Sequence, residues 1–171
     1  SSYKENSLQG DSVLSEIYEH FGVKTYFEEN NIVLKKVQNA TLETLNLKLH
    51  DAPDIAQTIA VTCFGLGMGC DLTGLHTLPI KETDRLAAMK TELEKVGATV
   101  TITNESLHLE KGQAIVANQA IDTYNDHRMA MAFAPLALKT SLFINDAGVV
   151  SKSYPDFWKD MKRVGLQISS V

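Results

Sequence analysis

The stretch that decides the fold is residues 89–109, MKTELEKVGATVTITNESLHL. Its first half carries apolar residues at helical spacing, and Gly97 follows where a helix C-terminus often needs a left-handed backbone. Residues 98–102 then alternate between apolar and polar side chains, which predicts a strand with one buried face. The polar run 104–106 predicts a turn into a second strand at 107–109. The stretch therefore predicts a helix, a glycine at its end and a β-hairpin.

The same pattern occurs twice more in the chain. Residues 13–34 read VLSEIYEHFGVKTYFEENNIVL, and residues 157–168 read FWKDMKRVGLQI. In each stretch a helical pattern ends at a glycine and a strand pattern follows it. The three glycines, Gly22, Gly97 and Gly165, lie 75 and 68 residues apart. This spacing indicates an internal repeat of roughly 70 residues.

The middle copy of the repeat has a further half in front of it. A strand pattern at 45–49 precedes a helix that begins after Pro53, and a short strand is predicted near Leu72. The complete unit is therefore predicted to be β-α-β-α-β-β. The third copy has the same outline, with strands predicted at 114–116, 141–144 and 166–168 and helices at 126–138 and 155–164.

We expect a single α/β (α+β) domain that covers residues 1–171. The helix pattern at 129–137 is apolar almost all round, so we expect that segment to lie centrally. The first unit contains only its second half, and the chain does not begin with methionine. We therefore expect a piece of a longer protein. The expected units are a partial one at 1–38 and two fuller ones at 41–110 and 111–171.

Composition excludes several classes of function. Of the 171 residues, 44% are hydrophobic and 22% charged, and the net charge of −5 argues against a general nucleic-acid surface. No apolar run reaches the roughly 20 residues that a membrane span needs, so we expect no membrane partner. Cys63 and Cys70 have no companion metal-ligand pair, which favours a reduced, cytoplasmic chain with free thiols and no metal site. The glycines at 65, 67 and 69 end a helix, so we interpret them as a turn and not as a phosphate-binding loop.

Three predicted helices begin with cations, although a helix N-terminus is the positive end of its dipole. In LPIKETDRLAAM, residues 78–89, a strand-like run at 78–80 leads into a helix, and Lys81 and Arg85 lie at the start of that helix. His127 and Arg128 follow an N-cap, Asn125 or Asp126, at the start of the next unit's first helix. Lys152 stands just before the helix that Pro155 begins. A fourth helix start carries an acid instead, Asp54.

Strand-to-helix turns of an α/β repeat lie along one edge, so these helix starts can be neighbours. Helix N-termini with cations beside them form an anion site, and several cations indicate a ligand with more than one negative charge. Asp54 and Glu82 among them would suit proton transfer on a phosphorylated or carboxylated substrate. Taken singly, each cation is also compatible with a solvated side chain, Asp54 with a helix cap and His127 with a structural hydrogen bond.

Four motifs, in this order, resemble one enzyme family. They are PDIAQTIA, KETDRLAAM, YNDHRMAMAF and SKSYPDFW, and the opening Leu8-Gln9-Gly10-Asp11 is similar too. The chain resembles the 5-enolpyruvylshikimate-3-phosphate synthases (3-phosphoshikimate 1-carboxyvinyltransferases) over nearly its whole length.

The resemblance implies half of an inside-out α/β barrel, with helices inside and sheets outside. It implies that this chain is most of the C-terminal domain of a two-domain enzyme whose active site lies between the domains. The reaction it implies transfers the enolpyruvyl group of phosphoenolpyruvate to the 5-hydroxyl of shikimate 3-phosphate and releases phosphate. No metal or organic cofactor is needed, and the chain alone, without the N-terminal domain, is expected to be inactive.

The resemblance also implies roles for individual residues. Asp54 would bind the shikimate hydroxyls and accept a proton, Glu82 would donate a proton to the methylene carbon, and Lys81 would contact shikimate 3-phosphate. The family often has Asn where this chain has Thr77, so that contact is left out of the expected site. The phosphoenolpyruvate-binding residues would be Arg85, Arg128 and Lys152, with His127 in a supporting role.

Three alternatives stay open. One is the related UDP-N-acetylglucosamine enolpyruvyl transferase, which shares the fold but has different motifs. The second is a non-catalytic module of the same fold that binds a phosphorylated metabolite or a partner protein. The third is a structural repeat protein whose helix starts are merely capped, which leaves the cations at those starts unexplained. A binding module has no need of the acid pair Asp54 and Glu82, whereas an enolpyruvyl transfer does.

Overall fold

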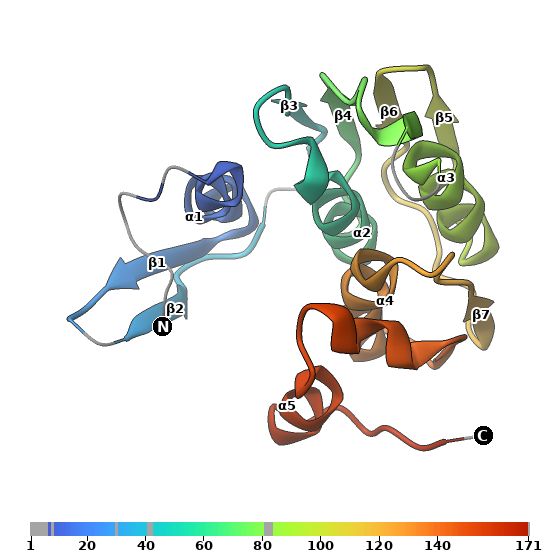
Figure 1. Ribbon diagram of the computed structural model, residues 1–171. Coiled ribbons are helices and arrows are strands. Elements are labelled where there is room, and N and C mark those ends of the chain that lie inside the picture. The colour runs from blue at the N-terminus through green and yellow to red at the C-terminus, as the bar shows by residue number, and fades with distance from the viewer. Residues whose placement is uncertain (1–6, 8, 30, 41–42, 81–83, 171) are drawn as a thin grey trace.

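The computed structural model describes residues 7, 9–29, 31–40, 43–80 and 84–170. Figure 1 shows three groups of elements: a helix with a projecting hairpin, a four-stranded sheet with helices beside it, and a smaller C-terminal group. The strands are β1 Val23–Phe27, β2 Ile32–Lys36, β3 Leu45–Lys48, β4 Cys70–Thr73, β5 Val100–Ile102, β6 Ser106–Leu109, β7 Gln119–Ile121 and β8 Leu142–Ile144. The α-helices are α1 Leu14–Ile17, α2 Ala56–Leu66, α3 Arg85–Lys95, α4 His127–Phe133 and α5 Phe157–Arg163. Short 3₁₀ helices are η1 Gly10–Val13, η2 Tyr18–Phe21, η3 Pro53–Ile55, η4 Leu78–Ile80, η5 Ala134–Leu138 and η6 Ala147–Lys152.

The middle unit has the predicted β-α-β-α-β-β order. Its sheet runs β3-β4-β6-β5, with β3 parallel to β4 and the other neighbours antiparallel. Leu72 of β4 pairs with Leu107 of β6, and both side chains are buried. Residues 98–102 alternate in exposure as predicted: Ala98 and Val100 are buried, and each is followed by an exposed threonine. Helices α2 and α3 pack beside this sheet (Figure 1).

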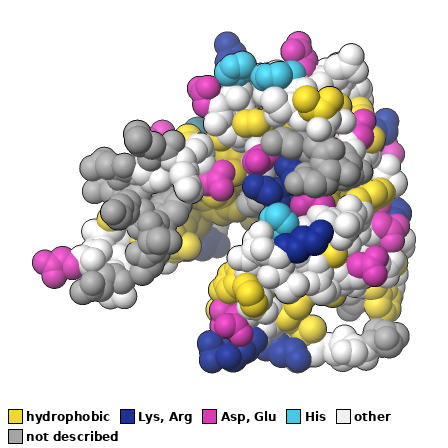
Figure 2. All heavy atoms as spheres, in the orientation of Figure 1, with side chains coloured by type: hydrophobic (Ala, Val, Ile, Leu, Met, Phe, Trp, Pro, Cys, Tyr) yellow, Lys and Arg dark blue, Asp and Glu magenta, His cyan; other side chains and the backbone are white. Residues whose placement is uncertain are grey.

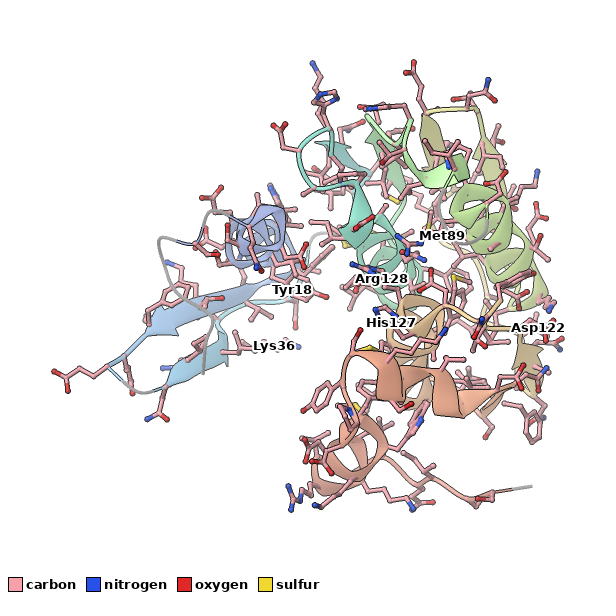
Figure 3. All side chains as sticks on the ribbon, in the orientation of Figure 1. Tyr18, Lys36, Met89, Asp122, His127 and Arg128 are labelled. Carbon is pink, nitrogen blue, oxygen red and sulfur yellow. The ribbon has the colours of Figure 1, made fainter. Side chains whose placement is uncertain are left out.

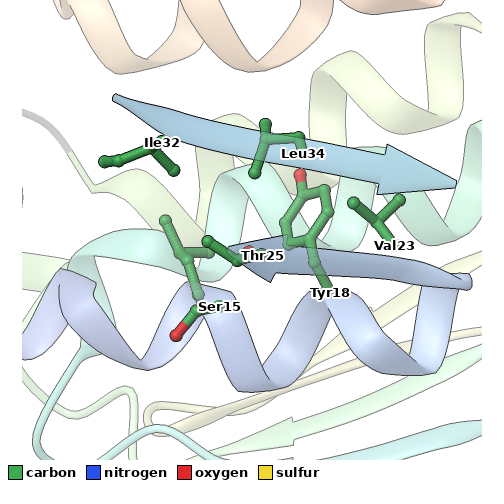
Figure 4. Close-up of a pocket in the computed structure, with 7 residues that line it drawn as sticks. Ser15, Tyr18, Val23, Thr25, Ile32 and Leu34 are labelled. Carbon is green, nitrogen blue, oxygen red and sulfur yellow. The ribbon is translucent and has the colours of Figure 1, made fainter. Parts of the chain in front are cut away.

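The first unit is the predicted second half of a repeat. The segments η1, α1 and η2 form one run of helical turns that ends at Gly22, whose φ is +80°. Strands β1 and β2 then form an antiparallel hairpin with Val23 opposite Lys36. Figure 4 shows the hairpin over α1, where Tyr18, Val23 and Leu34 line an open apolar pocket.

The third unit departs from the sequence prediction at both ends. Residues 114–116 are not a strand; Val116 donates its N–H to the carbonyl of Val96, so this run packs over the end of α3. The strand is β7 instead, which pairs in parallel with β8. Residues 166–168 are also not a strand, because within the described part of the chain they have no ladder partner and a strand needs one.

Proline explains two smaller errors. The strand-like run Leu78-Pro79-Ile80 is the 3₁₀ helix η4, since proline has no N–H for a sheet ladder and fixes φ near a helical value. The helix predicted at 126–138 changes at Ala134 into the 3₁₀ helix η5, where Pro135 removes an α-helical hydrogen bond.

The core joins the second and third units. Met129, Ala130 and Phe133 of α4 are fully buried, as predicted for a central helix, and α4 packs against α2. Figure 1 shows these helices on the inner side and the sheets further out. Cys63 and Cys70 are free and buried, as predicted, and Gly67 ends α2 with a left-handed φ of +74°. Among the described residues, none of the helices combines the length and apolarity that crossing a bilayer demands.

Gly97 is the glycine that follows α3 in the middle repeat unit. Its φ is +101°, and an added Cβ would lie 2.5 Å from the carbonyl oxygen of Ala114. Gly67 has a similar sign of φ but open space around an added Cβ. We expect Gly67→Ala to lower the free energy of unfolding by about 1–2 kcal/mol, the usual cost of a left-handed residue, and Gly97→Ala to lower it further. Urea denaturation measures both; equal losses in the two variants would contradict the close packing of residues 114–116 on α3.

Candidate active site

Arg85, the first residue of α3, is buried and not poised in solvent. The N-cap of α3 is Asp84, whose Oδ1 accepts from the N–H of Ala87 at 3.0 Å. The residue that follows this cap is Arg85, and its side chain is only 1% exposed. A buried guanidinium requires fixed partners, because removing a charge from water is costly.

Two carboxylates from different units hold Arg85. Its Nε lies 2.7 Å from Oδ2 of Asp126, and its Nη1 lies 2.9 Å from Oδ1 of Asp54. Asp54 lies in η3, which leads into α2. Asp126 is the N-cap of α4, and its Oδ1 accepts from the N–H of Arg128 at 2.9 Å. The guanidinium therefore ties together the starts of α2, α3 and α4.

Asp54 is shared between two arginines. Nη2 of Arg128 lies 3.3 Å from Oδ2 of Asp54, while Arg85 holds the other oxygen. The side chains of Asp54 and Arg128 are 29% and 33% exposed, so both remain reachable from solvent. Figure 3 shows Arg128 at the junction of α2 and α4.

His127 lies beside this pair. Its Nε2 is 3.3 Å from Nη1 of Arg128, and its Nδ1 is 3.9 Å from Oδ1 of Asp126. The imidazole is 19% exposed, between the buried carboxylate and the more open guanidinium (Figure 3). This position is compatible with orienting Arg128.

Lys152, at the end of η6, approaches the same helix start. Its Nζ donates to the carbonyl oxygen and to Oδ1 of Asn125, both at 2.9 Å. Asn125 directly precedes the α4 cap, so Lys152 lies next to the cluster and clamps the chain that leads into it. In Figure 2 basic, acidic and imidazole side chains gather at the middle of the face shown.

Two of the predicted site residues, Lys81 and Glu82, lie outside the described residues. Thr77 precedes η4, and its Oγ1 is buried with no hydrogen-bond partner among the described residues. The role of Asp126 in the site was not evident from the sequence. Its position predicted a helix cap, but a cap motif does not indicate that the same carboxylate also pairs with a buried arginine. The described residues contain no group of three or more metal-ligating side chains.

The arrangement suits an anion with more than one charge. Fixed guanidinium and ammonium groups converge on helix N-termini, which themselves favour anions. A partly exposed carboxylate lies within the same cluster and can accept a hydrogen bond from a bound hydroxyl. Cations that stabilise a leaving anion and a carboxylate that accepts a proton are the elements of a group-transfer site.

The fold is that of the enolpyruvyl transferases. The structure matches EPSP synthase from Acinetobacter baumannii with a TM-score of 0.76 at 25% identity, covering 90% of this chain and 39% of that one. It also matches the enolpyruvyl transferase NikO from Streptomyces tendae with a TM-score of 0.69 at 13% identity, covering 92% of this chain and 36% of that one. The second likeness shows the fold alone.

Sequence comparison narrows the class to one family. The family model of EPSP synthase (3-phosphoshikimate 1-carboxyvinyltransferase) matches residues 2–161, so the chain belongs to that family. It is 43% identical over 166 residues to the 3-phosphoshikimate 1-carboxyvinyltransferase of Bacteroides fragilis, covering 95% of this chain and 40% of the relative. The Neisseria meningitidis serogroup B enzyme of the same name is 33% identical over 154 residues, covering 90% and 36%. The chain thus spans about two fifths of the length of these relatives.

Arg85 gives a test of the buried cluster. Arg85→Ala leaves Asp126, only 2% exposed, without its buried cation, and we expect the free energy of unfolding to fall by about 3–5 kcal/mol. Lys90→Ala is the matched control, because Lys90 pairs on the same helix with Glu94 in an exposed 3.6 Å contact. The control should change stability by less than about 0.5 kcal/mol. Urea unfolding at the same midpoint for both variants would show that the buried pair does not organise the site.

Proposed function

We propose that this chain is part of an enzyme that transfers the enolpyruvyl group of phosphoenolpyruvate to the 5-hydroxyl of shikimate 3-phosphate, with release of phosphate. This reaction belongs to the shikimate pathway of aromatic amino acid biosynthesis. The observation that carries the proposal is the convergence of Asp54, Arg85 and Arg128 from three helix starts. Family membership supplies the substrates and the reaction class.

The chain supplies one side of the site in this proposal. Residues 1–171 form most of a C-terminal domain, and an N-terminal domain of the same enzyme covers the cluster and completes the contacts to both substrates. The span of about two fifths of the relatives' length supports this division. The chain by itself is then expected to be inactive.

The cations hold phosphoenolpyruvate. Arg128 is one-third exposed and presents its guanidinium at the start of α4, and Lys152 brings an ammonium to the same helix start. Arg85 lies behind them as a fixed positive charge that also orients Asp54. Together these groups bind the phosphate and carboxylate and stabilise negative charge as phosphate leaves. His127 supports the site by its contact with Arg128.

The carboxylates move protons. The 5-hydroxyl oxygen of shikimate 3-phosphate attacks carbon 2 of phosphoenolpyruvate as Asp54 accepts the hydroxyl proton and Glu82 donates a proton to carbon 3. The resulting tetrahedral intermediate then returns a proton from carbon 3 to Glu82 and expels phosphate, which takes up the proton held by Asp54, and the carbon–carbon double bond is restored. Lys81 contacts shikimate 3-phosphate. Neither step needs a metal or an organic cofactor. The two free thiols, Cys63 and Cys70, agree with a reducing, cytoplasmic setting.

The experiment uses the full-length protein with both substrates and measures phosphate release. We expect Asp54→Asn and Arg128→Gln each to lower kcat/KM by at least about 100-fold, since each removes a fixed charge at the reacting groups. Arg163→Gln is the control, because Arg163 is two-thirds exposed on α5 and, among the described residues, pairs with Asp160 of its own helix. Its kcat/KM should match that of the unmodified protein.

Two results would contradict the proposal. One is phosphate release that Asp54→Asn leaves unchanged. The other is binding of phosphoenolpyruvate to the full-length protein without any release, which would favour the non-catalytic binding module. The isolated chain should bind phosphoenolpyruvate weakly, with a Kd on the order of millimolar, because half of the contacts are missing.

A further inference from the structure

The segment that delivers the α4 cap has an unusual backbone. Within the described ranges, four non-glycine residues have positive φ: Asn118, Tyr124, Asn125 and Asp146. Three of these are Asn or Asp, which tolerate that conformation, whereas a bulky tyrosine is an outlier. Tyr124 and Asn125 have φ of 53° and 58° and are adjacent, directly before the Asp126 cap. A conformation that costs about 1–3 kcal/mol per residue persists only when its surroundings enforce it.

A buried carboxylate on α3 enforces it from one side. Glu92 is fully buried, and its Oε1 accepts from the hydroxyl of Tyr124 at 2.6 Å. Its Oε2 accepts from the N–H of Asp122 at 3.0 Å. One carboxylate therefore holds the segment at two points, where it leaves β7 and at its first left-handed residue.

Lys95 compensates the buried charge of Glu92. Its Nζ lies 2.9 and 2.8 Å from the two oxygens of Glu92 and 2.7 Å from Oδ2 of Asp122. Asn145 donates to the other oxygen of Asp122 at 2.7 Å, which joins β8 to the network. Figure 3 shows Asp122 beside β7, near the C-terminal end of α3 and away from the junction where Arg128 lies.

The shifted pKa values of Tyr124 and Lys95 favour the protonated forms that bind Glu92. Burial and the hydrogen bond to Glu92 raise the pKa of Tyr124 to about 12, so its hydroxyl remains a donor in neutral solution. Burial alone would lower the pKa of Lys95, but hydrogen bonds to Asp122 and Glu92 outweigh it and raise the pKa above its ordinary 10.5. The stabilisation by the Lys95 ammonium is therefore complete below that value and is lost only as the pH rises through the raised pKa.

Helix α3 thus contacts this segment at two places on one face. Arg85 and Glu92 are seven residues apart, two helical turns or about 10 Å along the axis. Arg85 binds the Asp126 carboxylate, and Glu92 binds the chain just before it. From the opposite side, Lys152 clamps Asn125 through its carbonyl and its side-chain oxygen.

We infer that Glu92 is a positioning residue: through Tyr124 and the Asp122 backbone it fixes the left-handed turn that places Asp126, His127 and Arg128. It touches no substrate and acts through the start of α4. Its contribution to catalysis rests on the proposed function, whereas its contribution to the geometry of the turn does not.

The test compares Glu92→Gln and Tyr124→Phe with two controls in the full-length protein. Glu94→Gln alters an exposed carboxylate on the same helix, and Tyr26→Phe alters a half-exposed tyrosine on the hairpin. We expect both test variants to lower kcat/KM at least about tenfold, because a small misplacement of binding groups is enough. Tyr124→Phe, which removes no charge, should keep a melting temperature close to the controls, whereas Glu92→Gln loses its buried pairing with Lys95 and should melt lower. The backbone N–H signal of Arg128 in amide NMR spectra should also shift, since that N–H donates to Asp126.

Each outcome decides the inference. Unchanged kcat/KM and an unchanged Arg128 signal in Tyr124→Phe would overturn it, as would equal changes in the controls. If Glu92→Gln does not fold, Tyr124→Phe carries the test, because it removes one oxygen and keeps the ring. If the unmodified protein releases no phosphate, the proposed function fails, and the Arg128 signal alone then supports or overturns the positioning role.

Discussion

The site depends on one buried guanidinium shared between two carboxylates. Arg85 lies at the start of α3 with 1% of its side chain exposed, and it holds Asp54 from one repeat unit and Asp126 from the next. Such a group cannot move to solvent without leaving Asp126 buried and unpaired, which is costly. The three helix starts are therefore held in one arrangement. The more exposed cations are positioned by their own contacts beside it, Arg128 with Asp54 and Lys152 with Asn125.

This arrangement explains why cations stand at helix starts where the dipole disfavours them. The local cost of each, about 0.3–1 kcal/mol, is small beside the attraction of a buried carboxylate at 2.7 Å. Arg85 is thus a structural cation with a functional consequence, because it fixes Asp54 while Arg128 stays reachable. Two turns further along α3, Glu92 acts in a similar way. Its buried, hydrogen-bonded carboxylate holds residues 122–124 of the next repeat unit in a backbone conformation that is otherwise unfavourable.

Much of this could be predicted from local sequence. The glycine ends at Gly22, Gly97 and Gly165, the middle unit and the central α4 follow from periodicity and cap chemistry, and positive φ angles at all three glycines confirm them. Both arginines singled out by the motifs, Arg85 and Arg128, lie within hydrogen-bond distance of Asp54, while the roles of all three toward a substrate stay a prediction. Strands at 114–116 and 166–168 were wrong, because a strand depends on a partner that local alternation does not reveal. The partners of Arg85 and the role of Glu92 depend on contacts more than 25 residues apart in sequence, which periodicity does not encode.

The most direct measurement is a double-mutant cycle between Arg85 and Asp126. Arg85→Met removes the charge at similar length, and Asp126→Asn removes the charge while its side-chain oxygen can still cap α4. Urea unfolding of the two single variants and the double variant gives their coupling energy. We predict about 1.5–3 kcal/mol, the upper range for residues in direct contact, and additive losses within about 0.5 kcal/mol would contradict the central place of this ion pair.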